Sequence, residues 1–444
     1  MRAARKQLPA GSIFLVLIAV LGAACGSSVP SAPSATGALQ TAPATTGVTA
    51  TGGIRADVEA MLQARDTVHP DGWFGMDRDE WISAADEVDA RAENLSDDER
   101  LVELVRLAAM PTWNGRDGHS GIWPFTPGDG THLYPVRWWR FPEGLVITAA
   151  RPPYEDLVGA RVEAIGGRPI DEVLRLVEPL APRDNPSNLL AFSTLFLRVP
   201  ELLAGLGVID AAGPTPFTVV GRDGVRRDVT IEPVTPEASD AWDSGLPHRL
   251  APTDAAWLRD QDTTLWWTFL EDSGTQFAQF NAVRGDATAV ISEIRDRAQA
   301  DDVERVVIDL RHNSGGDNTT LAPLELALRD PAIDQPGKLY AIIGRVTFSA
   351  AANFATDLER ATSVTFAGED MGGSPNLFGD TRPVTLPDSG QVLRMAARYW
   401  ERSTPDDMRI TIEPEIRAEL AADDYFAGRD PVLEAIVAAS TNSD

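Results

Sequence analysis

The C-terminal half of the chain alternates short apolar runs with helical patterns. Val306–Leu310 and Leu339–Ile343 are apolar at almost every position and rich in β-branched residues, as in strands buried on both faces of a sheet. An earlier run, Phe277–Asn281, is expected to open this domain as a strand, with Ala287–Ala298 following as a helix. A small-residue helix is expected to start at Ser349. Strands alternating with helices predict an α/β fold with a mostly parallel sheet.

The segment that follows the first 53 residues has a helical pattern. Between Ile54 and Met110, apolar residues recur at helical spacing, and Ser96 with Glu99 forms a capping box between two helices. We interpret the segment as a small helical bundle whose apolar faces are core and bind no cofactor. The residues on its two faces are Trp81, Ala84, Ala85, Val88 and Ala92, and Leu101, Leu104, Val105 and Ala108.

Residues 134–233 are rich in short apolar runs and turns. A glycine pair, Gly166 and Gly167, follows a short run and precedes a helical pattern, an order that resembles a PDZ-like module. Such modules capture a peptide as an added strand. A structural β-rich spacer remains the alternative, because Pro182–Leu206 reads as an unusual helical insertion. The other predicted elements are the helix Ile170–Val177 and the late strands Pro216–Val220 and Asp228–Ile231.

The first 53 residues have the composition of a targeting segment and a tether. Three basic residues precede the apolar run Ile13–Leu21, which predicts a secretory signal peptide that is too short to span a membrane. Cys25 is the only cysteine, so no intramolecular disulfide is possible. Its position after small residues resembles a bacterial lipoprotein signal, with Cys25 acylated and the protein anchored to the cell membrane; cleavage with release is the alternative. Residues 26–53 predict a flexible tether.

Composition and charge narrow the classes of partner. A chain of 444 residues is long enough for two or three domains, and 24% charged with 43% apolar residues is an ordinary globular composition. The formal net charge of −27 argues against nucleic acid as a partner. Lys6 and Lys338 are the only lysines. No metal-ligand spacing and no phosphate-binding glycine loop occurs, so no metal and no cofactor is expected.

A glycine turn and a serine provide the candidate chemistry. The turn Arg311–Gly316 ends in two glycines that let the backbone bend sharply and leave amide N–H groups exposed. Ser349 stands at a helix start among small residues, which suits a nucleophile beside an oxyanion hole. The alternative is that Ser349 only caps the helix, since serine is a favoured cap residue.

Three segments together resemble the tail-specific, or C-terminal processing, serine proteases. They are Val307–Gly316, Thr347–Ala351 and Gly368–Gly373, and the resemblance extends over most of the chain from about Ile54. It implies a crotonase-like α/β core, Ser349 as the nucleophile, and hydrolysis of a peptide bond through an acyl-enzyme. The oxyanion hole would consist of the amide of Ala350 and that of Gly315 or Gly316.

The family uses either a lysine or a histidine as the base, and this chain favours histidine. The position of the dyad lysine aligns with Ser374; Lys6 leaves with the signal peptide, and Lys338 precedes its strand on the side far from Ser349. In the His-dependent branch an Asp-Gly-His turn supplies the base, and His119 in Asp117–Gly121 matches that turn. A surface turn histidine is the alternative interpretation.

The third catalytic member is an acid in the family. Its glutamate position aligns with Met408, and Asp407 or Asp406 substitutes for it after a small shift. A pair of solvated loop aspartates is the alternative.

The overall expectation is a serine-type endopeptidase acting on peptides or proteins outside the cytoplasm. A non-catalytic ligand- or peptide-binding lipoprotein on the same scaffold is the rival, because the family also resembles retinoid-binding relatives. A hydratase or isomerase of the wider crotonase type would leave Ser349 and the Asp117–Gly121 turn without a purpose. The expected divisions are a signal peptide (1–25), a tether (26–53), a helical domain carrying His119 (54–125), a PDZ-like domain (126–235) and a crotonase-like protease core (236–444), with Pro236–Leu258 as a polar linker.

Overall fold

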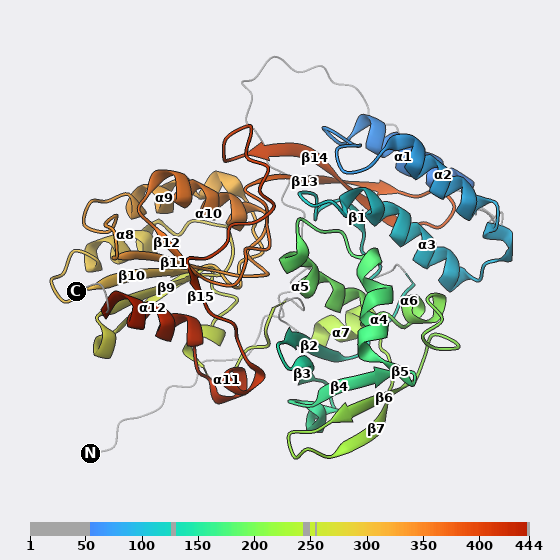
Figure 1. The fold of residues 1–444 in the computed structure, drawn as a ribbon, viewed down its shortest axis with the longest axis horizontal. Helices are drawn as coiled ribbons and strands as arrows, with labels where there is room; N and C mark the ends of the chain where they lie inside the picture. Colours follow the sequence, from blue (N-terminus) through green and yellow to red (C-terminus); the bar gives the residue numbers. More distant parts are fainter. Residues whose placement is uncertain (1–53, 126–129, 243–248, 254, 442–444) are drawn as a thin grey trace, which may run out of the picture.

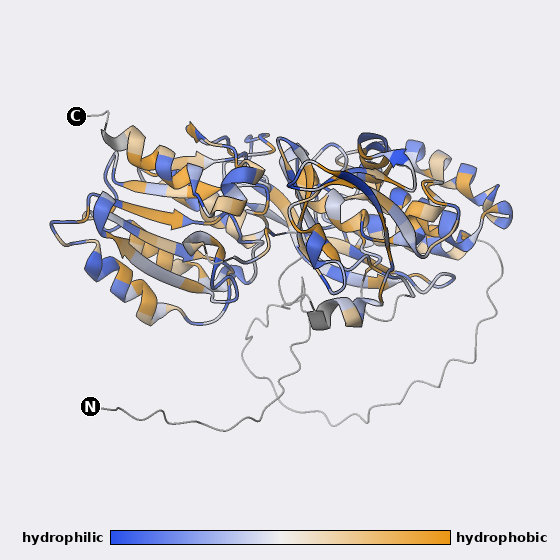
Figure 2. Cartoon of the chain, turned by 90° about the horizontal axis from the view of Figure 1, so that it is seen from below, coloured by the Kyte–Doolittle hydropathy of each residue, from blue (hydrophilic) through white to orange (hydrophobic). Residues whose placement is uncertain are grey.

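The computed structural model describes residues 54–441, apart from 126–129, 243–248 and 254. The predicted signal peptide, Cys25 and the tether therefore lie outside the described residues. The described chain forms two lobes, one around a six-stranded sheet and one around the N-terminal helices and a second sheet (Figure 1). Apolar residues concentrate on the strands and on the inward sides of the helices (Figure 2).

The six-stranded sheet confirms the expected parallel arrangement. Its order is β15 (Ile416–Arg417), β12 (Thr365–Gly368), β11 (Leu339–Ile343), β10 (Arg305–Asp309), β9 (Thr275–Phe280) and β8 (Leu265–Leu270). All neighbours pair in parallel except β8 with β9. The prediction that Phe277–Asn281 opens the sheet was wrong, because the aromatic strand β8 comes first. It pairs on one side only and keeps most of its side chains partly exposed, so it lacks the continuous buried pattern that marked the other strands.

Helices cover both faces of this sheet (Figure 1). Val306 and Ile308 point into one apolar cluster, which they share with α8 (Thr288–Arg297), α9 (Ala322–Leu328) and α10 (Ala350–Ala361). Val307 points the other way, into a cluster that includes residues of α11 (Ala422–Ala427) and α12 (Pro431–Thr441). The alternation explains why β10 reads as apolar throughout: a strand between two helical layers has no solvent face.

The second sheet has the order β2 (Val136–Phe141), β3 (Gly144–Ala150), β4 (Arg161–Ile165), β6 (Thr215–Val220) and β7 (Arg226–Ile231), with β5 (Arg168–Pro169) on β4. An antiparallel bridge between Leu133 and Val234 joins the segment before β2 to the segment after β7. The predicted helix is found as α4 (Ile170–Val177), and the predicted insertion as α5 (Pro186–Phe196) and α6 (Pro200–Gly205).

The N-terminal helices are α1 (Arg55–Thr67), α2 (Arg78–Asp89) and α3 (Asp97–Ala109). The capping box is confirmed: the Ser96 side chain accepts from the Glu99 N–H, and the Glu99 carboxylate accepts from the Ser96 N–H. Short 3₁₀ turns connect the elements, at Ala92–Asn94, Met110–Thr112, Glu155–Leu157, Glu178–Leu180, Ala256–Leu258, Glu271–Ser273 and Asn318–Thr320.

A C-terminal hairpin connects the two lobes. β13 (Asn376–Thr385) and β14 (Val392–Glu401) belong to a separate three-stranded sheet and extend over the N-terminal helices (Figure 1). The two-residue strand β1 (Gly121–Ile122) pairs antiparallel with β14, Gly121 opposite Arg394. This pairing fixes the position of the His119 turn, which lies directly before β1. No sequence pattern predicted it, because a two-residue strand has no periodicity.

The segment expected to be a polar linker is packed where it is described. It contains a short helix, α7 (Pro236–Trp242), and then Leu250, Trp257 and Leu258 are buried. Arg249 is also buried and donates to the Asn281 carbonyl at 2.8 Å. The linker interpretation was therefore wrong for this stretch, because its few apolar residues and one arginine anchor it to the core.

Candidate active site

Ser349 lies in a strained turn between the end of β11 and α10. Its φ of 55° and ψ of −125° place a non-glycine residue at positive φ, a conformation that is retained where the surrounding structure enforces it. Serine nucleophiles at sharp strand-to-helix turns share this feature, which lifts the hydroxyl away from the helix. Although Ser349 occupies the cap position of α10, its side chain makes no capping hydrogen bond. The interpretation of Ser349 as a helix cap is wrong in this structure.

His119 meets Ser349 across 230 positions of sequence. The His119 Nε2 and Ser349 Oγ atoms are 3.0 Å apart, within hydrogen-bond reach of a base and its nucleophile. The imidazole is 2% exposed and stacks on the Phe348 ring at 4.4 Å between centroids. His119 is therefore not a surface turn histidine, and its ring is held against the residue that precedes the nucleophile.

Burial keeps the His119 imidazole neutral. It lowers the pKa of His119 to about 4, while the charge of Asp117 and the Phe378 carbonyl act in the opposite direction. The ring Nδ1 has no hydrogen-bond partner among the residues that the structure describes. A base must be unprotonated to accept a proton, so at neutral pH His119 is in the state that the chemistry requires.

Asp117 stabilises the turn through its carboxylate. Its carboxylate accepts from the Ser120 N–H at 3.0 Å and bonds His69 Nε2 at 3.1 Å, with Arg65 Nη1 at 3.6 Å. Burial opposes its ionisation, but His69 and Arg65 outweigh that effect and lower the pKa of Asp117. The buried negative charge is thus compensated, and it contributes to His119 only through space.

The glycine turn lies against Ser349. A Cβ added to Gly315 would lie 2.7 Å from the Ser349 Cβ, and one added to Gly316 would lie 2.0 Å from the Val283 oxygen. Both residues also have positive φ, so a side chain at either position would be strained as well as blocked.

The three expected oxyanion donors differ in their bonding. The Gly315 N–H donates to Asn313 Oδ1 at 2.9 Å, so it is already engaged. The N–H groups of Gly316 and Ala350 make no hydrogen bond within the described part of the chain. Gly315 therefore shapes the turn by its small size, and the two remaining amides are the available donors.

The position of the dyad lysine holds a buried serine. Ser374 donates its N–H to Asp184 Oδ2 at 3.0 Å and its hydroxyl to the Ile410 carbonyl at 3.0 Å. Lys338 lies at the start of β11 and donates to the Ala298 carbonyl at 3.3 Å. Since Ser349 follows the other end of that strand, Lys338 is separated from it by the full length of β11.

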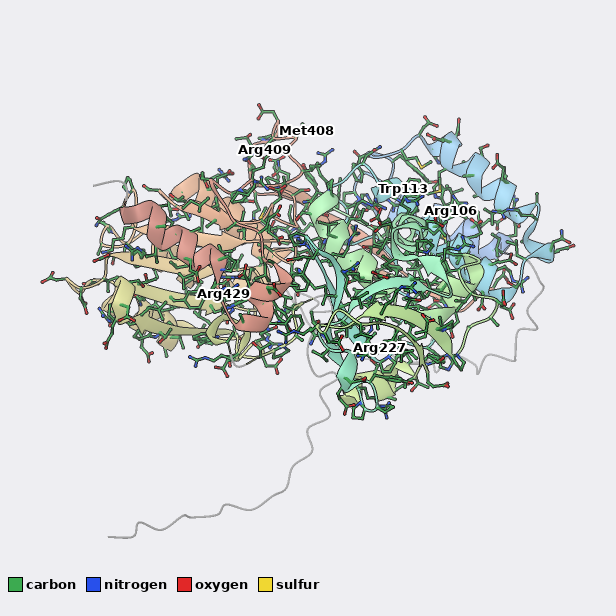
Figure 3. All side chains as sticks on the ribbon, turned by 60° about the horizontal axis from the view of Figure 1, so that its bottom comes forward. Arg106, Trp113, Arg227, Met408, Arg409 and Arg429 are labelled. Atoms are coloured by element: carbon green, nitrogen blue, oxygen red, sulfur yellow. The ribbon has the colours of Figure 1, made fainter. Side chains whose placement is uncertain are left out.

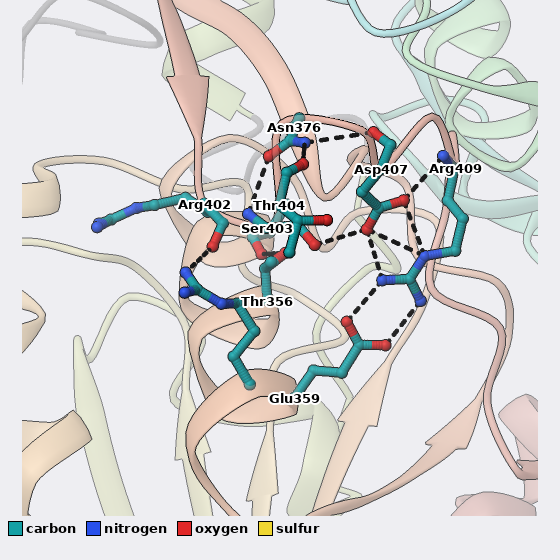
Figure 4. Close-up of polar contacts among 10 residues, drawn as sticks. Thr356, Glu359, Asn376, Arg402, Ser403, Thr404, Asp407 and Arg409 are labelled. Atoms are coloured by element: carbon teal, nitrogen blue, oxygen red, sulfur yellow. Dashed lines mark hydrogen bonds and ion pairs between the residues drawn. The ribbon is translucent and has the colours of Figure 1, made fainter.

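Asp407 is committed to a different contact (Figure 4). Its carboxylate accepts from Ser403 Oγ at 2.6 Å and from Arg409 Nη2 at 2.7 Å, and Arg409 also forms a bidentate pair with Glu359 of α10 at 2.8 Å for each bond. Hydrogen bonding to Arg409 holds the pKa of Asp407 well below its usual range. The structure does not bring Asp407 to His119, whose Nδ1 lacks any partner among the described residues.

The neighbouring Met408 occupies the aligned glutamate position and points into solvent (Figure 3). It is 63% exposed, with its sulfur 3.6 Å from Arg116 Nη1. The loop that carries the acid in the family therefore has another use here, which is to bind α10 through Arg409.

Sequence reasoning missed two residues next to the site. Asp117 opens the Asp117–Gly121 turn, and its position gave a signal: an acidic residue two positions before a histidine can raise the pKa of that histidine. Asp184, which is fully buried and bonds the Gly118 N–H at 2.5 Å, carried none, since the pattern Asp-Asn-Pro marks only a helix start.

Among the described residues, no group of three or more His, Cys, Asp or Glu side chains is arranged to hold a metal ion. A hollow of about 900 Å³ lies at the far end of β9 and β10, near Ser273, Arg297 and Arg305. It is remote from Ser349 and takes no part in the site.

Comparison with solved structures identifies the fold. Mature CPAF complexed with lactacystin matches at 14% identity with a TM-score of 0.59, over 86% of this chain and 98% of that chain. A serine-to-alanine mutant of CPAF matches at 11% identity with a TM-score of 0.62, over 87% and 96%. The photosystem II D1 C-terminal processing protease matches at 12% identity with a TM-score of 0.39, over 86% and 96%.

At the level of the fold, the resemblance to the tail-specific serine proteases is confirmed, because the CPAF likeness spans almost the whole of both chains. No protein-family model matches the chain, and no curated protein sequence matches it.

Proposed function

We propose that this protein is a serine-type endopeptidase that hydrolyses peptide bonds through an acyl-enzyme on Ser349, with His119 as the general base. The observation that carries the proposal is the 3.0 Å contact between His119 Nε2 and Ser349 Oγ, at a strained turn where the hydroxyl caps nothing. A buried, neutral imidazole beside an uncommitted hydroxyl is what activation of a serine requires.

The reaction then follows from the placement of these groups. His119 Nε2 accepts the Ser349 proton as Oγ attacks the substrate carbonyl carbon, and the Ala350 and Gly316 N–H groups stabilise the resulting oxyanion. The imidazolium donates its proton to the leaving amine. A water then attacks the acyl carbonyl carbon while His119 accepts its proton, and the imidazolium returns that proton to Ser349 Oγ as the carboxylic acid leaves. The charge of Asp117 stabilises the imidazolium through space, in place of a carboxylate bonded to Nδ1.

The substrate in this proposal is a peptide or protein. The CPAF neighbours support a peptidase, and the middle sheet between β2 and β7 is the part of the chain that we interpret as PDZ-like. A crotonase-like architecture of the six-stranded sheet is part of the same proposal.

We further propose an extracytoplasmic location with a lipid anchor at Cys25, on the basis of the sequence before residue 54. No helix in the described residues is both long and apolar enough to cross the bilayer. Cys25→Ala should move the mature protein from the membrane fraction to the soluble fraction, and unchanged fractionation would show that Cys25 carries no lipid.

A fluorophosphonate probe tests the function, because it reacts only with an activated serine. The adduct should map to Ser349, and Ser349→Ala should remove labelling without lowering the thermal midpoint. Ser96→Ala is the matched control: it removes another serine before a helix and should leave labelling intact. An unlabelled wild-type protein would favour the rival, a ligand-binding protein on the same scaffold. A Ser349→Ala variant that labels as the wild type does would assign the activated serine to another position.

A further inference from the structure

Asp184 connects the two halves of the candidate site although it belongs to neither. It lies two residues before α5, after the 3₁₀ turn Glu178–Leu180, and has no exposed surface. Its Oδ1 accepts from the Gly118 N–H at 2.5 Å, and its Oδ2 accepts from the Ser374 N–H at 3.0 Å. Its carbonyl accepts from the Arg116 N–H at 2.9 Å. One buried residue therefore bonds both the turn of His119 and the loop at Ser374.

Each of these two segments adjoins residues that flank the reacting pair. Gly118 immediately precedes His119, and a Cβ at Gly118 would lie 3.0 Å from the Phe348 ring. Gly373 precedes Ser374, donates to the Thr347 carbonyl at 2.8 Å, and has Ala352 of α10 within 2.3 Å of a built Cβ. A shift in either segment therefore displaces His119 or the turn that carries Ser349.

The bonding of Asp184 depends on its charge. An ionised carboxylate accepts at both oxygens, whereas a protonated carboxyl group uses one oxygen as a donor and leaves one N–H unpaired. Burial raises the pKa of Asp184 to about 7; the Gly118 and Ser374 N–H groups and Arg116 act against this rise, and Asp117 adds to it. No cation bonds the carboxylate, so the two amides are its hydrogen-bonded support within the described chain.

We propose that Asp184 is a positioning residue whose ionised carboxylate aligns the His119 turn with the Ser349 turn. The inference rests on the proposed function, and it adds a group that touches neither the substrate nor the reacting atoms. It predicts that the reactivity of Ser349 increases when Asp184 loses its proton.

The structure also supplies a matched control. Asp57 is buried, and its carboxylate accepts from two backbone amides, the Asp388 N–H at 2.7 Å and the Ser389 N–H at 3.0 Å. Burial raises its pKa too. It ties α1 to the tip of the β13–β14 hairpin, away from Ser349. Asp57→Asn therefore removes the same kind of contact without reaching the site.

The test compares fluorophosphonate reaction rates of the full mature chain, Asp184→Asn and Asp57→Asn between pH 5.5 and 8.5. At pH 8 the Asp184→Asn variant should react about 10- to 100-fold more slowly, the loss expected from slight misalignment of reacting groups. At pH 5.5 the two rates should converge, because the Asp184 carboxyl group is then neutral, as the amide that replaces it in Asp184→Asn is at every pH. Asp57→Asn should follow the wild type throughout.

A ratio of wild-type to Asp184→Asn rates that stays near one, or that is the same at every pH, would overturn the proposal. The wild type provides a second measurement if the variant does not fold: its own rate should show an inflection near pH 7, and a flat profile from pH 5.5 to 8.5 would also overturn it.

Hydrogen exchange separates this inference from the function. Peptides covering 116–120 and 371–376 should lose protection in Asp184→Asn and keep it in Asp57→Asn. A wild type that never labels would refute the peptidase function, and the exchange result would still decide whether Asp184 holds the two segments together. Unchanged protection in Asp184→Asn would refute that role of Asp184, and labelling would still decide the function.

Discussion

Ser96 and Ser349 both stand directly before a helix, and the two helices use them differently. Ser96 has an extended backbone, φ −64° and ψ 168°, and its hydroxyl accepts from the Glu99 N–H in a capping box. Ser349 has φ 55° and ψ −125°, makes no cap, and lies 3.0 Å from His119 Nε2. The backbone conformation decides where the hydroxyl points, and hence whether it stabilises a helix or is available to react.

The comparison also shows what determines that conformation. The start of α3 is exposed at Ser96 and Asp97, and its first turn is acidic, which favours a simple cap. α10 is buried along most of its first two turns, and Gly315 packs directly on Ser349. Surrounding contacts that tight can hold a residue at positive φ, a strain of about 1–3 kcal/mol.

The largest expected effect is the loss of His119. His119→Ala should lower kcat of peptide hydrolysis by on the order of 10⁴- to 10⁶-fold, as for other members of a cooperating pair. The double variant with Ser349→Ala should be little worse than either single one. His132→Ala is the control, because His132 is partly exposed and paired with Glu201 at 2.7 Å. If the His119→Ala protein kept most of its activity, the contact with His119 would not be what makes Ser349 reactive and Ser96 a cap.

The pH dependence sharpens the role of His119. An unperturbed histidine would give an inflection near 6.5, but burial lowers the pKa of His119 to about 4. Because the base works when neutral, kcat/KM of Asp184→Asn should rise with pH through the region near 4 and be level by pH 6, whereas the wild type should show a second rise near pH 7. The measurement is cleanest in Asp184→Asn, which lacks the carboxyl group that titrates near 7. An inflection that stays near 6.5 in that variant would mean that His119 is solvated.

Substitutions at Ser96 and Ser349 should change the stability of the protein in different ways. Ser96→Ala should lower the free energy of unfolding by about 1 kcal/mol, the usual value of a lost cap. The free energy of unfolding of Ser349→Gly should exceed that of Ser349→Ala by about 1 kcal/mol, because glycine adopts positive φ without strain. Chemical denaturation of the three variants measures both differences. Equal stabilities of the glycine and alanine variants would show that the turn at Ser349 is relaxed.

The smallest expected effect concerns Asp407. Asp407→Asn should leave the hydrolysis rate within about twofold, since the side chain touches neither reacting group. A loss on the order of 10⁴ is what removal of the third member of a triad would give. Glu359→Gln is the companion variant, because it breaks the other half of the Arg409 contact. A large loss in Asp407→Asn alone would restore Asp407 as the acid.

The sequence by itself predicted most of the elements and indicated Ser349 as the candidate nucleophile. Val306–Leu310 and Leu339–Ile343 read as buried strands because helices cover both faces of their sheet, and the capping box at Ser96 is a local bond between neighbours. The adjacent Gly315 and Gly316 indicated a sharp turn, and the structure has no room for a Cβ at either position. The chain has only two lysines, and the position aligned with the dyad lysine holds Ser374, so the sequence alone argued against a lysine base.

The tertiary structure alone decided how distant side chains meet. His119 reaches Ser349 because β1 pairs with β14 and Asp184 joins Gly118 to Ser374, contacts between segments far apart in the chain. Asp407 failed to reach His119 because Arg409 draws it to Glu359. Burial, which sets the pKa values of His119 and Asp184, depends on these same long-range contacts. Periodicity records only which face of an element is covered; what covers it, and at which distance, is fixed when the segments pack.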